Sequence, residues 1–71
     1  MMQGYQRRYL ILLLRGPWDD EDPEELREML FSASDNGWAI EDFGIEVFEK
    51  YGDRREIYPW WRIVRIETVV E

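Results

Sequence analysis

Apolar residues occupy both sides of the first patterned segment of the chain. In "YLILLL", residues 9 to 14, the odd and even positions are equally apolar, and successive side chains of a strand point to opposite faces. A strand that is apolar on both faces is typical of the middle of a sheet covered on both sides. The pattern, which begins near residue 5 and ends at Arg15, predicts a buried central strand. If a single helix covers one face, the other must meet a loop, the C-terminal segment or another subunit.

The next segment has the period of a helix. Asp22 is a suitable N-cap, Pro23 fits the first helical position, and Glu25 completes a capping box. Apolar residues recur at the i, i+3, i+4 and i+7 spacing of one buried stripe: Leu26, Met29, Leu30 and Ala33. The Asn-Gly pair that follows is a common helix stop. These signals predict a helix from Pro23 to Asp35.

The second half of the chain favours strands. After a connection through "WAIED", residues 43 to 51 alternate between apolar and polar, and "YGDRRE" is typical of a turn. The stretch "PWWRIVRIETVV" has two interpretations, one continuing strand or one helical turn that leads into a last strand near residues 65 to 70. The order predicts a single α+β domain over residues 1–71, a β-α-β-β(-β) unit with one helix packed across a mostly antiparallel sheet.

Composition narrows the possible chemistry. The chain has 71 residues, four tryptophans, no cysteine and no histidine, so it lacks thiolate ligands and the commonest general base. The hydroxyl side chains have no evident partner base and no glycine-rich phosphate loop is present, so we expect neither an enzyme nor a cofactor. The first apolar run is too short for a signal peptide or a membrane span. We therefore expect a cytoplasmic protein with no membrane contact.

Charge divides the chain into two parts. Residues 19–49 hold twelve acidic residues and one arginine, whereas the rest holds eight basic and four acidic residues, for a net charge of −7. On the predicted helix, Glu24, Glu28 and Asp35 share the face opposite the apolar stripe. With neighbouring acidic residues they predict a negative ridge, flanked by the aromatic Phe31, that binds a basic partner. The predicted partner-binding residues are Asp19, Asp20, Glu21, Glu24, Glu28, Phe31, Asp35, Glu41 and Asp42.

Two other interpretations of this acidity remain open. Acidic residues in a first helical turn stabilise the helix dipole, and net charge keeps a small protein soluble. The "DDED" stretch is also a weak candidate for a divalent cation site, although it lacks the glycine and spacing of a calcium loop. Aromatic and basic residues outside the acidic part suggest further contacts. Trp60 and Trp61 are adjacent, so at most one enters the core from a strand and the other is a candidate interface residue.

These observations favour a small acidic inhibitor or regulator that occupies a basic, nucleic-acid-handling surface of a target protein. By analogy of size and charge alone, such chains are typical of phage-borne inhibitors of host machinery, including anti-CRISPR proteins. One alternative is a structural or assembly subunit that forms a homodimer or larger homo-oligomer through its sheet or through Trp60 and Trp61. Another is a weak single-strand RNA or DNA binder that uses Arg54, Arg55, Arg62 and Arg65, which the net charge disfavours.

Overall fold

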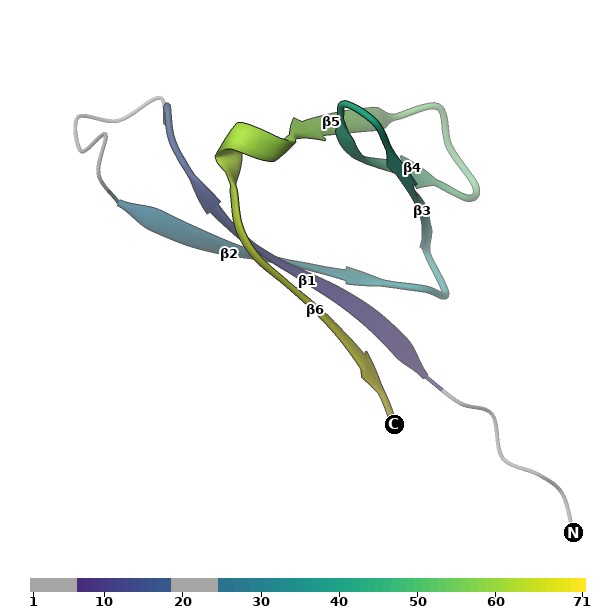
Figure 1. Ribbon diagram of the computed structural model, residues 1–71. Helices are drawn as coiled ribbons and strands as arrows, with labels where there is room; N and C mark the ends of the chain where they lie inside the picture. Colours follow the sequence, from purple (N-terminus) through teal and green to yellow (C-terminus); the bar gives the residue numbers. More distant parts are fainter. Residues whose placement is uncertain (1–6, 19–24) are drawn as a thin grey trace, which may run out of the picture.

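The protein folds as two small β-sheets packed against each other (Figure 1). The computed structural model describes residues 7–18 and 25–71. Its elements follow the chain in this order: β1 (Arg8–Arg15), β2 (Leu26–Ser32), β3 (Asn36–Glu41), β4 (Gly44–Glu49), β5 (Arg55–Pro59), the 3-10 turn η1 (Trp60–Arg62) and β6 (Ile63–Val70).

Sheet A has the strand order β2-β1-β6, and both pairings are antiparallel. The doubly apolar strand β1 is central, as its pattern predicts. In the register, Leu12 lies opposite Met29 of β2 and opposite Ile66 of β6. An irregularity in the pairing at Leu13 and Leu14 bends β6 near its start.

Sheet B has the order β3-β4-β5 and is also antiparallel. The turn at residues 33–35 carries the chain from β2 into β3, and η1 carries it back from β5 to β6. Figure 1 shows these two connections joining the layers. The last part of the chain therefore follows the second of the two interpretations considered, one helical turn and then a strand.

The core lies between the sheets. The fully buried side chains of β1, on its even-numbered face, meet those of β4 and β5: Leu10, Leu12, Leu14, Ile45, Val47 and Tyr58. Burying each such side chain stabilises the fold by about 1.5–3 kcal/mol. Trp18, Met29, Phe31, Trp38 and Ile63 pack around this cluster.

The predicted helix from Pro23 to Asp35 is wrong, and with it the α+β class. Residues 26–32 form strand β2, and no α-helix occurs in residues 7–18 or 25–71. In β2 the side chains alternate, so Met29 and Phe31 face the core whereas Leu26 and Leu30 do not. Pairing with β1 satisfies the backbone hydrogen-bonding groups along one edge of β2. This contribution outweighs a helical pattern of apolar residues that spans only two turns. The proposed start, Asp22 and Pro23, lies outside the described residues.

Two smaller corrections follow from the same rearrangement. The "WAIED" connection lies almost entirely in strand β3, and the Asn-Gly pair expected to stop a helix begins that strand. Sheet B takes the place of the helix as the cover for one face of sheet A. In the part of the chain that the structure describes, no helix is long and apolar enough to cross a membrane.

Candidate functional site

The outer face of sheet A, here called the open face, carries apolar side chains that no described segment covers. It consists of the odd-numbered positions of β1 and their cross-strand partners. Its apolar members come from all three strands: Tyr9, Ile11, Leu13, Leu26, Leu30 and Val69. Leu26 is 49% exposed and Leu30 is 63% exposed, although both belong to the hydrophobic class that normally fills a core.

A shallow hollow lies on this face, toward the end where β1 begins and β6 ends. It has a volume of about 280 Å³ and is lined by Tyr9, Ile11, Leu30, Val69 and Glu71. Four of these five residues are apolar or aromatic, and they come from three adjacent strands. An apolar surface of this kind on a small protein is a candidate contact surface.

The charged residues of the open face lie beside its central strand. Leu13 of β1 is opposite Glu28 on β2 and opposite Arg65 on β6, so the three form one row across the sheet. One step along, Ile11 is opposite Glu67. Arg65 Nη2 and Glu67 Oε1 lie 3.9 Å apart at the surface, which makes this a weak ion pair.

The acidic residues predicted to form one ridge occupy separate parts of the fold. Glu28 lies on the open face, Asp35 in the turn between β2 and β3, and Glu41 and Asp42 where β3 turns into β4. Without a helix, the spacing that aligned Glu28 with Asp35 no longer applies. The remaining acidic positions of that prediction, with the "DDED" cation candidate, lie outside the described residues: Asp19, Asp20, Glu21 and Glu24.

Phe31 also has a role other than the expected one. It lies on the inner side of β2, and its ring centroid is 6.1 Å from that of Tyr58 in the core. Burial raises the pKa of Tyr58 to about 12, with smaller contributions from the charge of Glu56 and from a hydrogen bond to that carboxylate. The aromatic pair therefore belongs to the packing between the sheets.

The two adjacent tryptophans differ in their contacts. Trp60 Nε1 donates to the backbone oxygens of Glu41, at 3.2 Å, and of Asp42, at 2.9 Å. It thereby ties η1 to the turn between β3 and β4. Trp61 is 62% exposed, so it is the better candidate for an interface residue.

Most of the arginines proposed for nucleic-acid binding already contact groups of the protein itself. Arg55 pairs with Glu46 at 2.6 Å, and Arg65 lies near Glu67. Arg62 Nε donates to the Arg15 backbone oxygen at 3.0 Å, and its guanidinium lies 4.9 Å from the Trp18 ring centroid. These contacts give the arginines structural partners.

Sequence reasoning missed the apolar members contributed by β2, since it assigned Leu26 and Leu30 to a buried helical stripe. The available signal was a spacing of two: Arg27, Met29 and Phe31 would share one face of a strand, and the residues between them the other face. Comparison with protein-family models, curated proteins and solved structures found no match for this chain. The functional argument therefore depends on the geometry of the fold.

Proposed function

We propose that the protein is a small assembly subunit, not an enzyme, that self-associates through the open face of sheet A. The observation that carries this proposal is the exposure of Leu26 and Leu30 beside the apolar centre of β1. Covering such a surface removes apolar area from water, which is the main favourable term in most protein association. The occupant that we propose is a second copy of the same chain.

The arrangement of charge on the open face supports a second copy as the occupant. A two-fold axis parallel to β1 places β2 of one copy over β6 of the other and preserves the position along the strands. Because Glu28 and Arg65 share the row of Leu13, each Glu28 then faces an Arg65 across the interface. Two such pairs form by symmetry around an apolar centre, which is the self-complementarity that a two-fold interface requires.

The size of the face sets the expected strength of this association. Two strands of eight residues and one of seven cover about 14 by 26 Å, so each copy contributes roughly 360 Å² in projection. The total, roughly 700 Å² in projection, is below the roughly 1,200 Å² at which standard specific interfaces begin, so the association belongs to the weak, transient class. We therefore expect a dimer that dissociates on dilution, with a dissociation constant on the order of micromolar.

The inhibitor proposal has less geometric support. Its central argument was the alignment of carboxylates on a helix, and residues 26–32 form a strand instead. A basic partner for the acidic segment stays a proposal from charge alone. The self-association proposal, by contrast, depends on described residues in all three strands of sheet A.

The decisive experiment is a charge exchange read by sedimentation velocity over a range of protein concentrations. Glu28→Arg places arginine against arginine in the proposed dimer, and Arg65→Glu places glutamate against glutamate, so each should weaken association. The double variant exchanges both members and should restore the dimer. If the double variant stays as weak as the single variants, the proposed arrangement is wrong.

Apolar substitutions provide a matched test of the face itself. Leu30→Lys should abolish the dimer, since it introduces a charge among the apolar residues of the open face. Ile57→Lys is the control because Ile57 is similarly exposed, at 54%, but lies on β5 of sheet B. A monomeric wild-type protein at about millimolar concentration, or equal loss in both variants, would contradict the proposal.

A further inference from the structure

A cationic cavity lies at the end of sheet A where the chain turns from β2 into β3. Its volume is about 590 Å³, and three basic side chains and two serine hydroxyls contribute to its lining: Arg7, Arg8, Tyr9, Ser32, Ala33, Ser34 and Lys50. The described part of the chain places no carboxylate in this lining. In a protein of net charge −7, such a local concentration of positive charge indicates an anion as ligand.

Backbone hydrogen bonds hold together the three segments that line this cavity. Arg7 and Glu71 exchange two backbone hydrogen bonds, and the Ala33 N–H donates to the Arg8 oxygen at 2.8 Å. The Lys50 N–H donates to the Asp35 oxygen at 3.0 Å. The start of β1, the β2–β3 turn and the segment after β4 are therefore fixed relative to one another.

The basic residues of the cavity form no ion pairs with other described residues. Within residues 7–18 and 25–71, the ion pairs involve Arg27, Arg55 and Arg65. Arg7, Arg8 and Lys50 do not take part in them. Arginine forms paired hydrogen bonds with phosphate oxygens, and lysine adds a point charge.

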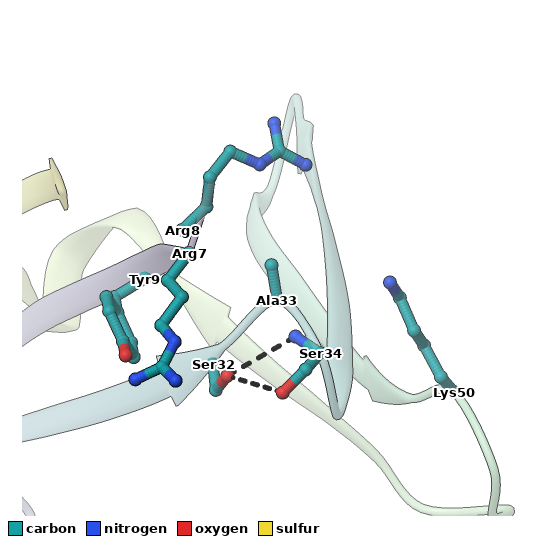
Figure 2. Close-up of a pocket in the computed structure, with 7 residues that line it drawn as sticks. All are labelled: Arg7, Arg8, Tyr9, Ser32, Ala33, Ser34 and Lys50. Carbon is teal, nitrogen blue, oxygen red and sulfur yellow. Dashed lines mark hydrogen bonds between the residues drawn. The ribbon is translucent and has the colours of Figure 1, made fainter. Parts of the chain in front are cut away.

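The two serines add a directed donor to this cationic setting. Ser32 Oγ and Ser34 Oγ lie 2.8 Å apart, and the Ser34 N–H donates to Ser32 Oγ at 3.3 Å (Figure 2). One hydroxyl of the pair donates its proton to the other oxygen, and the proton of the second hydroxyl is available to a ligand. Phosphate oxygens are acceptors of the kind that this proton suits.

Tyr9 gives the cavity an aromatic wall. Figure 2 shows the Arg7 side chain running beside Tyr9 toward Ser32, while Arg8 extends in the other direction. An aromatic ring with an adjacent guanidinium is a common platform for a nucleic-acid base. The cavity is also larger than a phosphate ion needs and falls in the size range of small-molecule sites.

We infer that this cavity binds a nucleoside monophosphate, either free or as the 5′-phosphorylated end of a nucleic-acid strand. The phosphate contacts Arg7 and the serine hydroxyl, Lys50 and Arg8 add positive charge around them, and the base lies against Tyr9. The site adjoins the open face and shares Tyr9 with it, so a bound nucleotide and a second copy would compete there, and the test uses protein concentrations low enough to keep the protein monomeric.

The test is a calorimetric titration with adenosine 5′-monophosphate, with adenosine as the ligand control. We expect saturable binding of the monophosphate and no measurable binding of adenosine. Arg7→Glu and Lys50→Glu should each weaken binding at least about ten-fold. Arg54→Glu makes the same charge change outside the cavity lining and should stay within about two-fold of wild type.

Two oligonucleotides distinguish the sources of the phosphate. A 5′-phosphorylated strand that binds more tightly than its unphosphorylated counterpart indicates a strand end, whereas preference for the free monophosphate indicates a nucleotide. Both results support the inference. Equal binding of adenosine and its monophosphate, or equal loss in Arg54→Glu and Lys50→Glu, would overturn it, and so would the absence of saturation at millimolar ligand.

Discussion

Gly44 and Pro59 pair across β4 and β5 with no space for a side chain between their backbones. A Cβ built on Gly44 would lie 2.7 Å from the Pro59 Cα and closer still to the Tyr58 backbone oxygen. Gly44 also has a φ of +152°, which residues with a side chain rarely adopt. A glycine is therefore required where sheet B approaches the η1 turn.

Gly44→Ala should destabilise the protein by about 2 kcal/mol or more, because neither neighbouring contact is a movable side chain. Urea denaturation measures the change in the free energy of unfolding. Gly52→Ala is the control, since its added Cβ would meet only the Glu49 side chain. A similar cost for both substitutions would contradict this account of Gly44.

Alanine substitutions in β2 distinguish the strand from the helix that the sequence predicts. Phe31 packs on the core beside Tyr58, whereas Leu30 is exposed. Phe31→Ala should therefore cost about 3 kcal/mol or more, and Leu30→Ala less than about 0.5 kcal/mol. The comparison is made at protein concentrations low enough to keep the protein monomeric. The opposite order, with Leu30 the costlier substitution, is what a helix with Leu30 in its buried stripe would give.

The first strand could be predicted because its signal does not depend on partners. Six consecutive apolar residues, 9 to 14, precede Arg15 and a Gly-Pro pair. This run is too short for a buried helix and is typical of a central strand. The same pattern indicated a second apolar face that needs a cover. Sheet A has that face, and its exposure is the basis of the self-association proposed here.

Strand β2 could not be predicted in the same way, because its identity depends on a partner distant in sequence. Leu26, Met29 and Leu30 satisfy a helical period, and Met29 and Phe31 satisfy an alternating one. Pairing of Leu12 with Met29 decides between the two, and local propensity carries no information about that contact. The alignment of Glu28 with Asp35 depended on the same helix and is lost with it. The cationic cavity could not be predicted either, because it combines segments that are adjacent only after folding.

Trp18 connects the end of the first strand segment to the start of the second. Two guanidinium groups contact its ring, with Arg27 Cζ 4.5 Å and Arg62 Cζ 4.9 Å from the ring centroid. Its Nε1 donates to the Glu25 backbone oxygen at 2.7 Å. Trp18→Leu should cost about 2 kcal/mol, from two cation–π contacts and one hydrogen bond. Thermal denaturation tests this, with Trp61→Leu as the exposed control, and equal effects would contradict it.

Tyr58 should make stability depend on pH in the alkaline range. Burial, together with the charge of Glu56 and the hydrogen bond to it, raises the pKa of Tyr58 from 10.0 to about 12. Between these values the folded protein keeps the phenol proton that the unfolded chain has lost. Unfolding therefore releases a proton. The contribution of Tyr58 to the free energy of unfolding is constant below pH 10 and falls as pH rises from 10 to 12.

Two measurements check this sign. In a spectrophotometric titration, one of the four tyrosines should ionise later than the others, and the late step should be missing in Tyr58→Phe. Urea denaturation of wild type should show the alkaline loss of stability, and Tyr58→Phe should show less of it. If the late step persists in Tyr58→Phe, the raised pKa belongs to another tyrosine. If stability instead rises between pH 10 and 12, the folded state favours the ionised phenol and the assigned environment of Tyr58 is wrong.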